Sequence, residues 1–171
     1  MTRWLGWVGL SWLLVGGSAG LARAQLMAPH TVSDSSAAAV RASALDTRAA
    51  KAEMAGNATE GLKLAEAAIE ADPKDPWAYY DRAVALASLN RTDGAVLSFA
   101  EAEKYFADQG EPWGKSIALY GEAHALSRAG RCDQAQSAFE RYASYVDQVD
   151  AASAAMARRY ARECVGRQAS R

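Results

Sequence analysis

The chain has 171 residues, of which half are apolar and 23% are charged, a composition typical of one globular domain rather than of a disordered segment. Forty residues are alanine and only four are proline, and because alanine has the highest helix propensity this predicts an all-helical protein with close packing. The formal net charge of −1 argues against a nucleic-acid partner, because phosphate binding needs a concentrated basic surface.

The N-terminal segment has the layout of a secretory signal peptide. An apolar run follows Arg3, and the small residues Ala22 and Ala24 form an A-x-A cleavage pattern. The run is about a dozen residues long, short of the roughly 20 needed to span a bilayer. We therefore expect a cleaved signal at residues 1–24, with retention as a membrane anchor as the alternative. The composition of this segment is typical of a bacterial protein, so the expected location is periplasmic or secreted.

Two further segments are expected to lack regular structure. Residues 25–35 have no apolar period and contain Pro29, which predicts a flexible linker. Residues 167–171 are expected to form a disordered tail. The folded domain is therefore predicted to span residues 36–166.

The domain carries an internal repeat. Apolar residues recur at three- and four-residue steps, as in amphipathic helices. A shift of 34 residues places Ala49 on Ala83, and a further shift of 40 places Ala83 on Ala123. The same shifts align Gly56, Asn90 and Gly130. A recurring period near 34 indicates an array of helix pairs, and we expect the six extra residues of the second interval to form a longer surface loop in "ADQGEPW".

The second unit, "PWAYYDRAVALASLNRTDGAVLSFAEAE", resembles the tetratricopeptide repeat family. The positions that carry the resemblance are Tyr79, Ala83 and Leu86 in its first helix and Ala95, Phe99 and Ala102 in its second. The resemblance implies an all-α, right-handed α-solenoid of about three helix pairs with a C-terminal capping helix. The units would span residues 42–75, 76–109 and 116–149, and the cap residues 150–165.

The resemblance also implies where a partner would bind. In this family the first helices of the pairs line a concave groove that holds an extended peptide or a helix. The candidate groove residues are Asp46, Glu53, Trp77, Tyr80, Val84, Ile117, Tyr120, His124 and Arg128. Tyr80 and Tyr120 occupy equivalent positions, and aromatic residues are enriched in binding hot spots. The alternative is that these aromatics only pack between neighbouring helices.

One known variant of this groove does not fit the sequence. Some family members grip a C-terminal carboxylate with Lys and Asn side chains of the first helices. The corresponding positions of the first unit hold Asp46 and Ala50. A carboxylate clamp is therefore not expected.

The two cysteines of the chain are predicted to be neighbours. Cys132 lies at the start of the second helix of the third unit, two residues after Gly130. Cys164 lies 34 residues after Gly130, at the equivalent position of the cap, and these two helices should run antiparallel. In an exported protein this pairing predicts a disulfide. It would close a loop of about 32 residues and stabilise the fold by about 3 to 4 kcal/mol. Free thiols and a functional thiol are the alternatives.

No metal or redox motif is present in the sequence. Residues 16–20 match the G-x-S-x-G pattern of a nucleophile elbow, but they lie within the expected signal segment, so no catalytic role is assigned to them. The expected function is therefore a non-catalytic protein-binding or scaffolding module of the cell envelope, with a protein or peptide partner and neither metal nor cofactor. The main alternative is a self-associating structural or assembly factor that acts through its outer surface. An enzyme is the third possibility, without a constellation of residues to support it.

Overall fold

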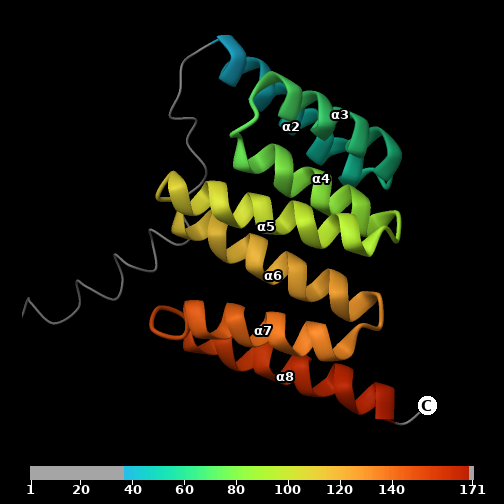
Figure 1. Cartoon of the computed structure of the whole chain (residues 1–171), viewed down its shortest axis with the longest axis vertical. Coiled ribbons are helices and arrows are strands. Elements are labelled where there is room, and N and C mark those ends of the chain that lie inside the picture. Colours follow the sequence, from blue (N-terminus) through green and yellow to red (C-terminus); the bar gives the residue numbers. More distant parts are fainter. Residues whose placement is uncertain (1–36, 170–171) are drawn as a thin grey trace, which may run out of the picture.

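A computed structural model describes residues 37–169, which form a stack of seven α-helices (Figure 1). The helices are α2 (Ala37–Met54), α3 (Ala58–Ala71), α4 (Pro76–Ser88), α5 (Thr92–Asp108), α6 (Pro112–Arg128), α7 (Cys132–Val146) and α8 (Ala151–Ala169). They follow one another along the long axis of the molecule, with α2 at one end and α8 at the other (Figure 1). Within this range there is no strand, and the architecture is an all-α helical repeat solenoid. The expected signal segment and linker lie outside the described residues.

Successive helices pack as pairs, α2 with α3, α4 with α5 and α6 with α7, and α8 packs against α7. The repeated alanines Ala49, Ala83 and Ala123 are all fully buried. A residue this small lets two helix backbones approach closely, and larger side chains such as Phe99 and Phe139 fill the space beside them. The seam of each pair therefore follows the repeat that the sequence shows.

The turn inside each pair is built in the same way. Gly56, Asn90 and Gly130 each have a positive φ, of 76°, 60° and 73°, a conformation that glycine adopts freely and asparagine tolerates. The N–H of the next residue donates to the carbonyl five residues before it, from Asn57 to Ala52 (2.8 Å), Arg91 to Leu86 (2.8 Å) and Arg131 to Leu126 (3.0 Å). This closes the end of each first helix in a Schellman-type cap.

The longer loop expected after the second unit does not exist. Residues 109–111 form a three-residue connection, as short as the turn at residues 89–91. The extra residues lengthen the helices instead, so that α5 and α6 each have 17 residues where α4 has 13. The prediction of a longer loop was wrong because Gly110 and Pro112 both fit a short connection. Gly110 makes another left-handed turn, with φ 69°, and Pro112 occupies the first turn of α6, where a missing N–H costs nothing.

The final helix closes the array. Ala154, Ala157 and Ala161 of α8 are buried against the core of α7. The helix continues to Ala169, beyond the predicted end of the domain at 166. The disordered tail expected from residue 167 therefore does not begin there, because Arg, Gln and Ala at positions 167–169 are all good helix formers.

Cys132 and Cys164 tie this capping helix to α7. Their Cα atoms are 5.3 Å apart, within the range that a disulfide spans. Both side chains are buried, and the pair encloses 32 residues of chain. The repeat register predicted this proximity.

Candidate functional site

The first helices α2, α4 and α6 share one side of the array, which we call the first-helix face. A pocket of about 170 Å³ lies on it between α4 and α6. We call this the aromatic pocket. It is lined by Tyr80, Val84, Ala87, Ser88, Phe99, Tyr120, Gly121, His124, Ala125 and Arg128. Five of the nine candidate groove residues thus meet around one cavity, namely Tyr80, Val84, Tyr120, His124 and Arg128.

The floor of the aromatic pocket is formed by α5, the helix that lies between α4 and α6 in the chain. Phe99 of α5 is 3% exposed, and its ring lies edge-on to Tyr80 with 5.7 Å between centroids. It reaches this position because Gly121 has no side chain: a Cβ there would come within 2.5 Å of Phe99 Cε1. The sequence reasoning placed Phe99 in the buried stripe and overlooked Gly121. A single glycine inside a helical pattern, as at Gly121, can indicate that another group packs closely against the helix, and this would have pointed to the contact with Phe99.

Tyr120 forms the opposite wall. Its ring packs against Tyr142 of α7 and Phe139 of α7, with centroid distances of 5.3 and 6.2 Å, and stacks with His124 at 6.0 Å. Tyr120 therefore both packs between helices and lines the pocket. Burial raises the pKa of the Tyr80 and Tyr120 phenols, so both are neutral hydrogen-bond donors at pH 7. Burial and the nearby Arg128 lower the pKa of His124, which keeps its imidazole neutral.

Two candidate groove residues lie elsewhere on α4 and α6. The indole of Trp77 packs against Phe106 and Trp113, with centroid distances of 5.0 and 5.5 Å. Ile117 is half-buried on α6. Neither residue lines the aromatic pocket. The packing interpretation therefore describes Trp77 better than a role in this cavity.

The remaining two candidates, Asp46 and Glu53, lie on α2 beside Asp81 of α4. We call these three residues the acidic slot. Burial, followed by the charge of Asp75, raises the pKa of Asp46 to about 9. Burial, Asp75 and Glu53 raise the pKa of Asp81 to about 7. Asp46 is therefore protonated in the free protein at neutral pH, and Asp81 is partly so. The sequence reasoning missed Asp81, which it did not distinguish from other polar residues of the second unit.

The acidic slot adjoins the aromatic pocket. Ser88 lines the pocket, and its hydroxyl donates a hydrogen bond of 3.3 Å to Glu53 Oε2. Tyr80 lines the pocket as well, next to Asp81 in the sequence. The two features are thus neighbours on either side of α4.

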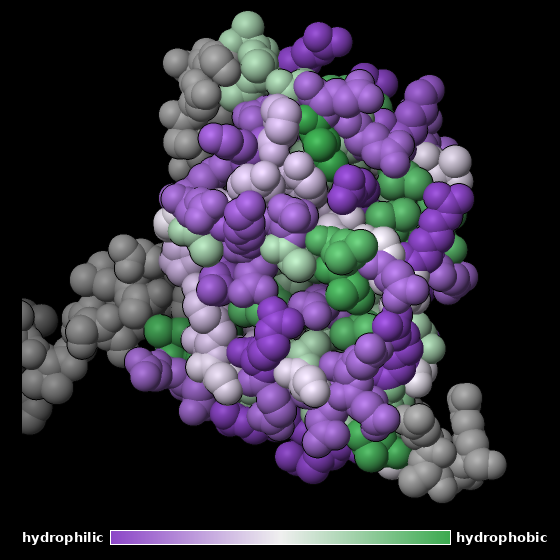
Figure 2. Space-filling view, in the orientation of Figure 1, coloured by the Kyte–Doolittle hydropathy of each residue, from purple (hydrophilic) through white to green (hydrophobic). Residues whose placement is uncertain are grey.

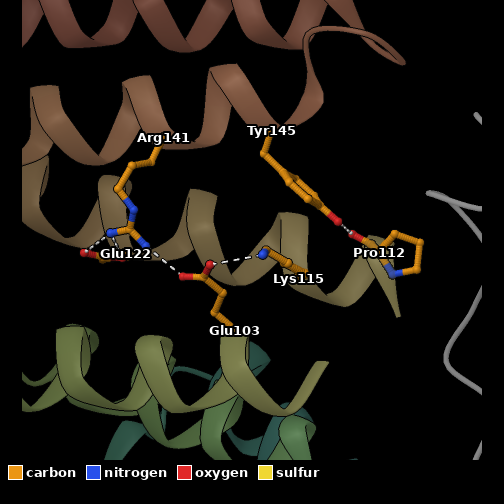
Figure 3. Close-up of polar contacts among 6 residues, drawn as sticks. All are labelled: Glu103, Pro112, Lys115, Glu122, Arg141 and Tyr145. Carbon is orange, nitrogen blue, oxygen red and sulfur yellow. Dashed lines mark hydrogen bonds and ion pairs between the residues drawn. The ribbon is translucent and has the colours of Figure 1, made fainter. Parts of the chain in front are cut away.

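A second, larger cleft of about 570 Å³ lies where α5, α6 and α7 meet. Its centre is a network of charges (Figure 3). Arg141 donates to Glu103 Oε2 at 2.7 Å and to both carboxylate oxygens of Glu122 at 3.0 and 3.2 Å. Lys115 adds a pair with Glu103 at 3.5 Å, and the Tyr145 hydroxyl donates to the Pro112 carbonyl at 3.3 Å. The charged groups satisfy one another, so this cleft joins three helices rather than offering free ligand groups.

Within residues 37–169, the other exposed apolar side chains lie on several helices. The view in Figure 2 is mostly hydrophilic, with small separate hydrophobic areas. The exposed large apolar residues are spread over three helices, namely Val40 and Met54 on α2, Leu97 on α5 and Met156 on α8. Within residues 37–169 no group of His, Cys, Asp or Glu is arranged to hold a metal ion. In the same range, none of the helices has both the length and the hydrophobicity that a bilayer crossing requires.

Comparison with known proteins agrees with the architecture. A family model described as tetratricopeptide repeat matches residues 64–96, from α3 through α4 into α5. No curated protein matches the sequence significantly. The match, together with the paired helices and the recurring turns, supports a tetratricopeptide repeat protein.

Proposed function

We propose that this protein is a non-catalytic binding module of the cell envelope that holds a segment of a partner protein on its first-helix face. Tetratricopeptide repeats generally mediate protein–protein interaction and are typically not enzymes. The observation that carries the proposal is the convergence of Tyr80, Val84, Tyr120, His124 and Arg128 on one pocket. These positions were assigned to the groove from the sequence, through its resemblance to the tetratricopeptide repeat family.

The size of the aromatic pocket favours one side chain of a longer ligand. Its volume of about 170 Å³ is below the roughly 300–1,000 Å³ of pockets that enclose whole small molecules. Tyr80, Phe99 and Tyr120 supply flat apolar walls. Aromatic contacts of this kind contribute most of the affinity in many interfaces. His124 and Arg128, both exposed, add hydrogen-bond donors at the rim for the backbone of a bound segment.

The envelope location is supported by the sequence and by the cysteines. The signal-like segment at residues 1–24 favours export. Cys132 and Cys164 lie at disulfide distance, and disulfides persist in oxidising compartments such as the periplasm. Cleavage after Ala24 is checked by N-terminal sequencing of the protein recovered from the source cells. An N-terminus at Met1 would contradict it.

The binding face is tested with the double variant Tyr80→Ala, Tyr120→Ala. Affinity capture with the wild-type protein should recover partners that the folded double variant loses. Leu97→Ala, at an exposed position of α5, is the matched control and should retain them. An unchanged set of partners for the double variant would exclude the first-helix face. Light scattering addresses the alternative of self-association, which a strict monomer at high concentration would exclude.

A further inference from the structure

We propose that the acidic slot receives a lysine or arginine side chain of the bound segment, so that the partner presents a basic residue beside an apolar anchor. This inference rests on the proposed function, because it places the segment on the same face and adds the chemistry of a second contact. Three observations support it: the place of the slot in the repeat, its unpaired acceptor and its charge.

The acidic slot occupies the place that the aromatic pocket occupies one unit further along. A shift by one repeat takes Tyr80 of the pocket to Asp46, Ala87 to Glu53 and Gly121 to Asp81. Asp46 and Glu53 therefore occupy positions on α2, next to α4, that are equivalent to those of Tyr80 and Ala87 on α4, next to α6. A segment laid across the first-helix face would meet an aromatic cavity in one interval and three carboxyl groups in the next.

One oxygen of Asp46 and one of Glu53 lack the donor that a buried oxygen needs, although Asp46 shares a hydrogen bond with Asp75 and Glu53 Oε2 accepts one from Ser88. Asp46 Oδ1 is buried without a hydrogen-bond partner, and Asp46 as a whole is 9% exposed. Glu53 Oε1 is also without a partner, but it lies against Gly61 of α3. Among the described residues, no ion pair includes Asp46, Glu53 or Asp81. An unpaired buried acceptor is destabilising. A ligand that brings N–H donors relieves this, and ammonium and guanidinium groups bring three and five of them.

The charges around the acidic slot favour a positively charged ligand group. The groups that act on Asp46 are Asp72 and Asp75, before or at the start of α4, and Asp81 within α4, all of them acidic. These residues are not arranged to hold a metal ion. A cationic side chain fits this surrounding, because it offsets the mutual repulsion of the carboxylates. Because burial and these neighbours raise the pKa of Asp46 and Asp81, a bound cation should release protons.

The distance between the two contacts predicts a spacing in the partner. Helix α4 contacts both α2 and α6, and packed helices lie about 8–10 Å apart. An extended chain advances about 3.3 Å per residue. The basic residue should therefore lie about three positions from the residue that fills the aromatic pocket.

The probe for this inference is a library of random twelve-residue peptides displayed on phage and selected on the full-length protein. Binders that fail on the Tyr80→Ala, Tyr120→Ala variant depend on the first-helix face. These should be enriched in Lys or Arg about three positions from an aromatic residue or leucine. A selected peptide is then synthesised with citrulline in place of Arg, or norleucine in place of Lys. Its affinity should fall by about tenfold or more, the effect expected for a buried charge contact.

Two measurements locate the effect in the slot. Asp46→Asn and Glu53→Gln should weaken the basic peptide and leave its neutral version unchanged, whereas Glu66→Gln, at an exposed position of α3, should change neither. Calorimetry at neutral pH in two buffers of different ionisation enthalpy should detect proton release with the basic peptide alone.

The outcomes separate the two proposals. If face-dependent peptides show no basic enrichment, or bind equally well with citrulline or norleucine, the acidic slot has no such role while the proposed function stands. If no selected peptide depends on Tyr80 and Tyr120, the proposed function fails and this inference with it.

Discussion

Gly121 lies against Phe99 so closely that the space of its missing side chain is filled by the ring. A Cβ at position 121 would come within 2.5 Å of Phe99 Cε1. This contact joins α6 to α5 and sets the depth of the aromatic pocket, because Phe99 is its floor.

Replacement of Gly121 by alanine should destabilise the protein although alanine favours helix. The clash is with the Phe99 ring, which is 3% exposed and packs against Tyr80, and overpacking of this kind costs about 1–3 kcal/mol. Urea unfolding measures the change. Gly166→Ala is the control, because no atom lies within 4 Å of a Cβ at that position, and it should stabilise slightly or not at all. Equal stability of Gly121→Ala and the wild type would contradict the packing described.

Loss of the Cys132–Cys164 link should loosen the capping helix. The link encloses 32 residues, so its removal by Cys132→Ala, Cys164→Ala should lower the free energy of unfolding by about 3–4 kcal/mol. A reducing agent should lower the melting temperature of the wild type and leave that of the double variant unchanged. If the oxidised wild type, unfolded in denaturant, reacted with two equivalents of thiol reagent, the disulfide would be absent.

Stability should fall as the pH rises from acid to alkaline. The folded-state pKa values of about 9 for Asp46 and about 7 for Asp81 lie above the ordinary value of 3.8. At pH values between the ordinary pKa and the folded-state pKa, the folded state holds a proton that the unfolded state has lost. The free energy of unfolding therefore decreases as the pH rises, by at most about 1.4 kcal/mol per pH unit for each such proton.

Urea unfolding at pH 5, 7 and 9 tests this. Asp46→Asn mimics the protonated form and should flatten the slope and stabilise the protein at pH 9. The control Glu66→Gln, on the exposed side of α3, should keep the wild-type slope. Stability at pH 9 equal to or above that at pH 5 would contradict the burial of Asp46 and Asp81.

The charge network of Arg141 should contribute modestly to the packing of α5, α6 and α7. Arg141→Ala leaves Glu122, which is 8% exposed, without its partner. Because the Arg141 side chain is half exposed and screened by solvent, we expect a loss of about 1 kcal/mol. The double variant with Glu122→Gln should recover part of it. Arg159→Ala, which breaks an exposed pair with Glu163, should have a smaller effect; an equal loss would contradict a special role for Arg141.

The sequence predicted the parts of this molecule that depend on repeated local geometry. Ala49, Ala83 and Ala123 marked the helix seams, and Gly56 and Gly130 marked turns that need a positive φ. Both signals are local, because they follow from residue size and backbone conformation. The register alone also placed Cys132 beside Cys164.

Other features depend on contacts across the array and were not predictable in the same way. The aromatic pocket has a floor because Gly121 on one helix admits Phe99 from another, a relation between two units that a search within one unit does not find. The extra residues near Gly110 were assigned to a loop because insertions are usual in loops. They extend α5 and α6 instead, because nothing before Gly110 ends the helix.

The central claim, that a partner segment lies on the first-helix face, is tested most directly by site-specific photo-crosslinking. A photoreactive phenylalanine analogue is placed at Tyr120, at the wall of the aromatic pocket, and separately at Leu97, an exposed position of α5. The protein is irradiated with its partner, and the joined peptides are sequenced by mass spectrometry. We predict crosslinks from position 120 to one segment of the partner and none from position 97. Crosslinks from position 97 alone would contradict the account.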